Sequence, residues 1–152
     1  MANYLLDTNN LIYLVDSNSD SEVKREALRE LRQKLSDPNN RFILTPLIRY
    51  EVMRGIKWED ETKLEELENI LKQFKSLDIR DEIADLARDL YRFDEYKSKR
   101  DNVPKNLEKR KFDMFHYATA KMENLEILSA DSHLSHIDRL YEQMSDEKQN
   151  AI

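Results

Sequence analysis

The chain has 152 residues, a net charge of −6, no cysteine and a single glycine, Gly55. The lack of cysteine excludes disulfides, Cys-ligated zinc, iron–sulfur clusters and a thiol nucleophile. A single glycine excludes the glycine-rich loops that bind nucleotide phosphates. The longest apolar run, residues 11–15, is far below the roughly 20 residues of a membrane span, and no secretory signal is evident. We therefore expect a cytoplasmic protein without a membrane segment.

The first half of the chain alternates between short apolar runs and patterns with helical spacing. Polar residues at 7–10 end the first apolar run, and Thr45-Pro46 is typical of a helix start. In chain order we expect a strand over Asn3–Leu6, a short helix over 11–15, a helix over 23–35 capped by Asp20 or Ser21, a turn at 37–40, a strand over 42–44, a helix from Leu47 to Gly55 and a helix over 64–74.

The second half continues this alternation. We expect a strand over 77–79, a helix capped by Asp81 with apolar residues up to Leu90, a basic loop around 102–104, a helix over 112–122, a strand over 126–129 and a turn from Asp131. Strands that alternate with helices predict a parallel sheet with helices on both faces. The sequence contains no repeat or linker, so we expect one α/β domain over residues 1–152.

Charge is segregated along the chain. Residues 59–68 contain six acidic residues and one lysine, whereas residues 97–111 contain seven basic residues and two acidic ones. Both segments are typical of solvated helix faces and loops. The basic segment is also a candidate for binding a polyanion.

Acidic residues occur where the predicted strands end. Asp7 follows the first strand directly, Glu51 lies in the helix after the second strand, and Asp131 follows the last strand. Asp113 lies in an apolar segment, where we expect it in the first turn of a helix. Because ligands of parallel sheets bind at the carboxyl ends of the strands, we expect these four carboxylates in one crevice.

Four carboxylates in one pocket repel one another unless their pKa values rise or a multivalent cation neutralises them. A site made only of oxygen ligands favours Mg²⁺ or Mn²⁺, and these ions commonly bind substrate phosphates as well. Such a site suits hydrolysis of phosphodiester bonds, because a bound ion activates water and offsets charge on the phosphate.

Four segments, in this order, resemble the PIN-domain ribonucleases. They are Asp7-Thr8-Asn9 after an apolar strand, Tyr50-Glu51-Val52 in a helix, Asp113-x-x-x-Tyr117-Ala118-Thr119-Ala120, and Leu128-Ser129-Ala130-Asp131. Together they extend from Tyr4 to about Ile137. Among PIN proteins, a single small domain is similar to the VapC toxins of bacterial toxin–antitoxin pairs.

The resemblance implies a three-layer fold with a small, mostly parallel central sheet flanked by helices. It places a catalytic and metal-binding quartet on Asp7, Glu51, Asp113 and Asp131, supported through hydrogen bonds by Asn9 and Ser129. It also implies an Mg²⁺- or Mn²⁺-dependent endoribonuclease that cleaves RNA, is held inactive by a cognate antitoxin and forms a homodimer.

Basic side chains near these segments are candidates for contacts with RNA phosphates or with an antitoxin. They are Arg49, Arg54, Lys97, Lys99, Arg100, Lys109, Arg110 and Lys111. The three histidines, His116, His133 and His136, are interpreted as packing or surface residues, because the oxygen ligands already suffice for a metal.

Simpler roles exist for each acidic residue taken alone. Asp7 and Asp131 can cap a helix or a turn, and Glu51 can be an ordinary surface charge. Two other functions also fit the whole pattern. One is a housekeeping PIN nuclease that processes RNA, and the other is an inactive PIN scaffold that binds RNA or protein.

Overall fold

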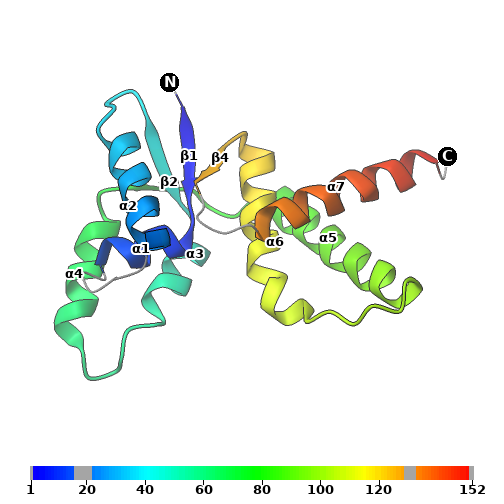
Figure 1. The fold of residues 1–152 in the computed structure, drawn as a ribbon, viewed down its shortest axis with the longest axis horizontal. Helices are drawn as coiled ribbons and strands as arrows, with labels where there is room; N and C mark the ends of the chain where they lie inside the picture. Colours follow the sequence, from blue (N-terminus) through cyan, green and yellow to red (C-terminus); the bar gives the residue numbers. More distant parts are fainter. Residues whose placement is uncertain (1, 16–21, 129–132, 151–152) are drawn as a thin grey trace. The chain divides into compact units, whose positions relative to one another are not determined.

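The computed structural model describes residues 2–15, 22–128 and 133–150. Two compact units make up the chain, and Figure 1 follows it through both. Unit 1 comprises Met1–Ile79 and Asn124–Ala130, and unit 2 comprises Arg80–Glu123 and Asp131–Ile152. None of the helices in the described part of the chain has the length and apolar character of a membrane span.

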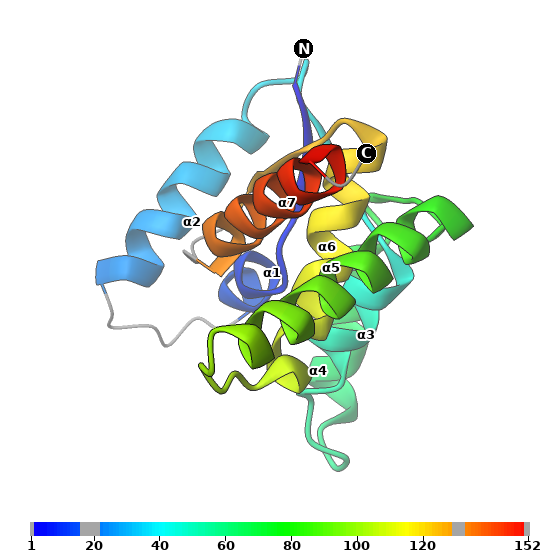
Figure 2. The ribbon, with the colours of Figure 1, turned by 90° about the vertical axis from the view of Figure 1, so that its right-hand side faces the viewer.

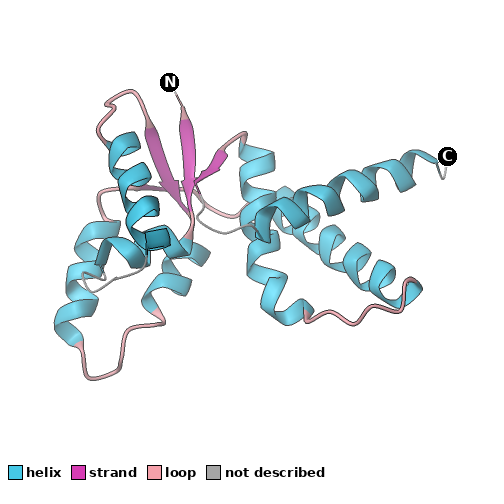
Figure 3. Ribbon diagram, in the orientation of Figure 1, coloured by secondary structure: helices cyan, strands magenta, loops and turns pink. Residues whose placement is uncertain are grey.

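Unit 1 contains a four-stranded parallel sheet, drawn in magenta in Figure 3. Its strands are β1 (Asn3–Leu6), β2 (Arg41–Leu44), β3 (Lys75–Ser76) and β4 (Glu126–Leu128), in the order β3-β2-β1-β4. The central strand β1 pairs through Leu5 with Ile43 of β2 and with Ile127 of β4. Leu5 and Leu6 are almost wholly buried, as the central strand of a parallel sheet requires.

Four helices complete unit 1. They are α1 (Thr8–Val15), α2 (Glu22–Leu35), α3 (Pro46–Met53) and α4 (Glu61–Leu71). The helix α1 packs against both α2 and α3. Each of the four helices places a fully buried side chain in the core of unit 1, and these side chains are Leu11, Leu31, Ile48 and Leu67.

Unit 2 consists of three helices in the described residues, and Figure 2 gives a second view of them. They are α5 (Asp81–Arg100), α6 (Leu107–Glu123) and α7 (His133–Asn150). Each helix packs against the other two. Ile83 and Leu90 of α5, Met114 of α6 and Ile137 of α7 are almost wholly buried, so this unit has its own apolar core.

The end of α5 is set by Asn102. This residue adopts a left-handed conformation with φ 55°, which asparagine tolerates better than most residues. The amide of Asn102 donates to the carbonyl of Lys99 at 3.3 Å, and the amide of Val103 donates to the carbonyl of Ser98 at 3.0 Å. These two bonds satisfy the last carbonyls of the helix and start the loop that leads to α6.

Several predicted elements are confirmed, namely the strand over Asn3–Leu6, the strand β2, the helix α3 and the long helix α2. The predicted strand over 77–79 is wrong, because β3 pairs with β2 through Lys75 and Ser76 instead. Asp81 is the first residue of α5 and not its cap, a position taken by Arg80 without a side-chain hydrogen bond. The predicted caps Asp20 and Ser21 lie outside the described residues.

The prediction for α6 is also corrected. The helix begins at Leu107 and not at Phe112, because the lysines and arginine of residues 109–111 are good helix formers and Glu108 suits the first turn. Asp113 was expected in the first turn of this helix. It lies instead in a later turn, because the helix begins at Leu107. The helix α7 was not predicted.

Candidate active site

Asp7 stands at the carboxyl end of the central strand. Its amide donates to the carbonyl of Leu128 at 3.3 Å, which extends the pairing of β1 with β4 by one residue. Its carboxylate Oδ1 accepts from the amide of Thr8, the first residue of α1, at 2.8 Å. The side chain is half-buried. The pairing with β4 therefore places Asp7 at the carboxyl end of the central strand, as predicted from the sequence.

Two polar neighbours of Asp7 lie in the first turn of α1. The hydroxyl Oγ1 of Thr8 is buried and has no hydrogen-bond partner among the described residues. Asn9, predicted to support the site, is half-buried two residues after Asp7. A buried hydroxyl without a partner costs free energy in an apolar environment, so the surroundings of Asp7 suit a polar ligand.

Glu51 is held by the helix α3. Thr45 caps this helix, because its Oγ1 accepts from the amide of Ile48 at 3.2 Å, and Pro46 occupies the first helical position. Ile48 and Val52 are buried, and Glu51 between them is half-buried. Glu51 is therefore partly shielded from solvent. Because α3 packs against α1, Glu51 and Asp7 lie on neighbouring elements of unit 1.

Asp113 belongs to unit 2. It is half-buried on α6, next to the buried Met114. His116 is 3% exposed and is thus a packing residue. Tyr117 is buried as well, and its hydroxyl donates to Oδ1 of Asp138 on α7 at 2.6 Å. Burial raises the pKa of Tyr117, and the hydrogen bond to Asp138 raises it further.

The predicted quartet is thus distributed over the chain. Asp7 and Glu51 lie in unit 1 and Asp113 lies in unit 2, whereas Asp131 and the predicted supporting residue Ser129 lie outside the described residues. Within the described part of each unit, no three His, Cys, Asp or Glu side chains gather as a metal site would need. The assembly of the four acidic residues around a metal stays a prediction.

The whole sequence from residue 4 to residue 140 matches the model of the PIN domain. The chain belongs to the PIN domain family. The predicted α/β fold with a small parallel sheet is thereby confirmed. Comparison with the sequences of curated proteins finds no significant match.

Three solved structures illustrate the similarity. VapC20 of Mycobacterium tuberculosis, described as a sarcin–ricin loop cleaving toxin, is 11% identical with a TM-score of 0.59, over 88% of this chain and 93% of its own. VapBC-1 of nontypeable Haemophilus influenzae is 17% identical with a TM-score of 0.58, over 93% of each chain. A toxin–antitoxin complex of Klebsiella pneumoniae is 26% identical with a TM-score of 0.51, over 82% of each chain.

The basic segment of this PIN domain is largely neutralised by ion pairs and hydrogen bonds within unit 2. Its partners are Gln143 for Lys97, Glu95 for Lys99, Glu147 for Arg100, Asp94 for Lys105 and Arg110, and Glu108 for Lys111. Lys109 is exposed and has no ion pair in the described part of the chain. Lys97, Arg100, Lys105 and Arg110 therefore bind partners in another element of unit 2, whereas Lys99 and Lys111 pair within their own helices. Contact of these basic residues with RNA or an antitoxin stays a prediction.

Asp94, the acidic residue that pairs with both Lys105 and Arg110, was not predicted from the sequence. Its side chain is wholly buried, and its two carboxylate oxygens accept from Lys105 and Arg110, each at 3.0 Å. The signal is present in the sequence, because Ile83, Ala87, Leu90 and Asp94 follow one another at helical spacing and all are buried. An acidic residue on an apolar helix face indicates a buried ion pair.

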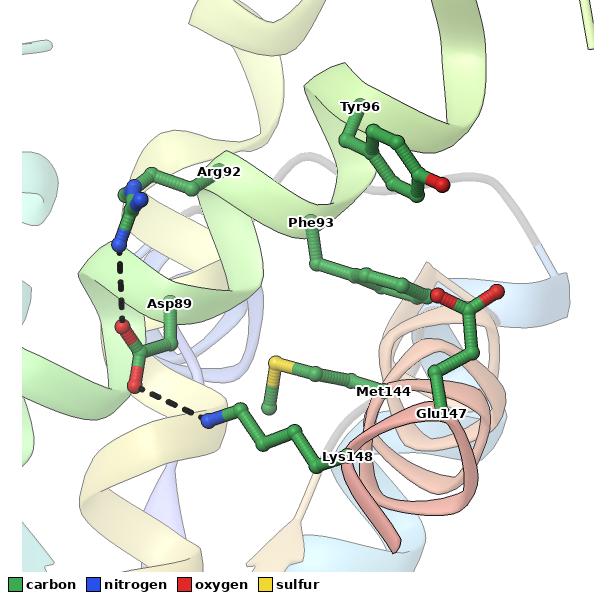
Figure 4. Close-up of a pocket in the computed structure, with 7 residues that line it drawn as sticks. All are labelled: Asp89, Arg92, Phe93, Tyr96, Met144, Glu147 and Lys148. Carbon is green, nitrogen blue, oxygen red and sulfur yellow. Dashed lines mark ion pairs between the residues drawn. The ribbon is translucent and has the colours of Figure 1, made fainter. Parts of the chain in front are cut away.

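Unit 2 also has a groove of about 440 Å³ between α5 and α7, shown in Figure 4. Its apolar lining comes from Phe93, Tyr96 and Met144. At one side, Asp89 pairs with Lys148 at 3.6 Å and with Arg92 at 4.0 Å. The groove contains none of the predicted catalytic residues of the PIN domain, so it is separate from the candidate active site.

Proposed function

We propose that this PIN domain is a metal-dependent endoribonuclease and the toxin of a toxin–antitoxin pair. One observation carries the proposal, namely the half-buried carboxylate of Asp7 at the carboxyl end of the central strand, beside the helix that holds Glu51. Solved structures with this fold include a toxin that cleaves the sarcin–ricin loop and complexes of toxins with antitoxins, which supports the same activity and a protein partner here.

The available donor atoms fit a hard divalent cation. Asp7 and Glu51 offer carboxylate oxygens from neighbouring elements, and the buried Thr8 hydroxyl is a further polar group near them. Oxygen ligands of this kind select Mg²⁺ or Mn²⁺. We propose that Asp113 and Asp131 complete the site, and that Asn9 and Ser129 support it through hydrogen bonds. A bound ion would supply a Lewis acid for water and for the scissile phosphate.

The other parts of the site have simpler roles in this proposal. The half-buried Arg49 and the exposed Arg54, on and just after α3, contact phosphates of the RNA or acidic residues of an antitoxin.

The single PIN domain acts in the cytoplasm as a homodimer. Its size in solution is measured by light scattering, and a monomer would contradict the dimer.

The test of this function is cleavage of total RNA by the purified chain. We expect cleavage with Mg²⁺ or Mn²⁺, none with EDTA, and a loss of at least about a hundredfold in Asp7→Asn and Glu51→Gln. Both substitutions keep size and polarity, so thermal unfolding must show that the variants fold. Expression of the wild type without its antitoxin should arrest growth, and Asp7→Asn should relieve the arrest.

The alternatives give different results. A housekeeping nuclease would cleave RNA without arresting growth. An inactive scaffold would leave the RNA unchanged with Mg²⁺, Mn²⁺ and EDTA alike.

A further inference from the structure

Among the described residues of unit 1, the most exposed large hydrophobic side chain is a tryptophan. Trp58 is the single tryptophan of the chain, and 91% of its surface is exposed. Tryptophan is among the most buried side chains on average, so this exposure is unusual. Trp58 lies in the turn that connects α3 with α4, and it contributes almost nothing to the core. Tryptophan is enriched among the residues that contribute most to binding interfaces.

Hydrogen bonds hold the turn that presents Trp58. The amide of Ile56 donates to the carbonyl of Met53 at 3.1 Å, and the amide of Asp60 donates to the carbonyl of Lys57 at 3.0 Å. The Asp60 carboxylate also caps α4, because it accepts from the amide of Lys63 at 3.1 Å. The turn is therefore fixed on both sides of Trp58. A side chain that is already positioned loses little backbone freedom on binding.

The charges on the two sides of Trp58 have opposite signs. Lys57 precedes it, and just after α3 the guanidinium of Arg54 lies over the ring of Tyr50 at 5.7 Å. The acidic segment of residues 59–68 follows it and leads along α4. A polyanion at Trp58 is therefore attracted along the α3 side and repelled along α4. The α3 side is the one that carries Glu51 of the proposed active site.

We propose that Trp58 stacks against an unpaired base of single-stranded RNA and guides the strand along α3 toward Glu51. This inference rests on the proposed ribonuclease function and adds a residue that binds an unpaired base of the substrate. Aromatic rings stack on any unpaired base, whereas the bases of a duplex are already stacked and paired. Arg54 and Lys57 hold phosphates next to the stacked base. Single-stranded RNA is therefore bound in preference to duplex RNA.

The single tryptophan makes the stacking directly measurable. The wild-type chain is kept in EDTA, so that no RNA is cleaved, and its tryptophan fluorescence is recorded while a short oligoadenylate is added. Stacking of adenine on Trp58 quenches this fluorescence. An RNA duplex of the same length should produce little quenching. Equal quenching by both, or none by either, overturns the proposal.

A pair of variants separates stacking from general attraction. Affinity for labelled oligoadenylate, measured by fluorescence anisotropy, should fall roughly tenfold to a hundredfold in Trp58→Ala. Trp58→Phe keeps an aromatic face and should retain most of the affinity. Because the side chain is exposed, neither substitution should shift the midpoint of thermal unfolding. Unchanged affinity in Trp58→Ala overturns the proposal.

Failure of this inference and failure of the proposed function give different results. If the wild type and Trp58→Ala cleave single-stranded RNA equally well with Mg²⁺, the chain is a ribonuclease and Trp58 does not bind its substrate. If the wild type quenches with oligoadenylate but never cleaves, stacking is supported and the nuclease function is refuted. If only an added antitoxin changes the fluorescence, the surface binds protein and the proposal is overturned.

Discussion

Asp94 is wholly buried in unit 2 with two cations bound to its carboxylate. Lys105 and Arg110 remain partly exposed, so water reaches the outer side of this cluster. A buried carboxylate is tolerated only when it is paired, and here the pairing connects α5 to the loop before α6 and to α6 itself. Arg110 lies one helical turn before Asp113. The cluster therefore fixes the part of α6 that carries a proposed ligand.

Removal of this carboxylate should be costly. We expect Asp94→Ala to lower the free energy of unfolding by about 2 kcal/mol or more, because it leaves two partly buried cations without their acceptor. Urea denaturation measures this loss. The matched control is Glu95→Ala on the same helix, which removes an exposed ion pair with Lys99 and should cost less than about 1 kcal/mol. Equal losses in the two variants would contradict the structural role of Asp94.

Tyr117 gives a prediction for the dependence of stability on pH. Burial, and then the hydrogen bond to Asp138, raise its pKa, so the folded chain holds the phenol proton more tightly than the unfolded chain. The unfolded phenol titrates near about pH 10. Above that pH the unfolded state binds fewer protons than the folded state, and the free energy of unfolding falls as the pH rises.

The variant Tyr117→Phe has no phenol proton, so its free energy of unfolding does not fall at alkaline pH because of this site. At neutral pH the variant should be less stable by about 1 kcal/mol, because the hydrogen bond to Asp138 is lost. The difference should narrow as the pH rises above about 10, since only the wild type loses stability at this site. Urea denaturation at a series of alkaline pH values measures both quantities. If the difference in free energy of unfolding between the wild type and Tyr117→Phe stays constant with pH, the raised pKa of Tyr117 does not contribute to stability.

At the scale of elements, the helix α3 depends on its first turn. Thr45 is 1% exposed, and its hydroxyl supplies the only side-chain cap of this helix in the described residues. We expect Thr45→Ala to lower the free energy of unfolding by about 1 to 2 kcal/mol, whereas Thr45→Ser keeps the hydroxyl and most of the stability. Thermal unfolding compares the two. If Thr45→Ser lowers the free energy of unfolding as much as Thr45→Ala does, the stability comes from the methyl group of Thr45 and not from its capping hydroxyl.

Local signals predicted elements well where they act within one segment. The apolar run of β1 and the Thr45-Pro46 start of α3 were both identified, because they depend on a few neighbouring residues. The strand β3 was misplaced by two residues, because its position is set by pairing of Lys75 and Ser76 with β2. The start of α6 was missed because charged residues there form helix as readily as loop.

At the scale of the whole molecule, the proposed site needs acidic residues from both units. The sequence predicted where Asp7 and Glu51 lie, since strand ends and helix caps are local features. Their grouping with Asp113 and Asp131 depends on long-range packing, which no spacing in the sequence reveals. Asp94 was missed although its spacing from Ile83, Ala87 and Leu90 places it on an apolar helix face, and Trp58 has no comparable signal in the sequence. Only the folded chain shows that the first is wholly buried and the second almost wholly exposed.

A site of carboxylates should respond to acid. We expect RNA cleavage to fall as the pH drops below about 6, because protons compete with the metal for the carboxylate oxygens. Raising the Mn²⁺ concentration should shift the decline to lower pH, since metal and protons compete directly. Initial rates measured at several metal concentrations provide the test. Activity that stays constant down to about pH 5 would contradict metal binding by these acidic residues.

The position of β4 in the sheet has a consequence for how the protein is made. Unit 1 begins with β1 but receives its fourth strand only from residues 126–128, after the chain has passed through α5 and α6. During synthesis, β1 can pair with β4 only after most of the polypeptide has been translated, so until then this edge of β1 lacks its partner strand. The carboxylate of Asp7, whose amide bonds to β4, therefore reaches its final setting late in synthesis. A nascent chain that has not yet made residues 126–128 therefore lacks the completed strand end at which Asp7 lies.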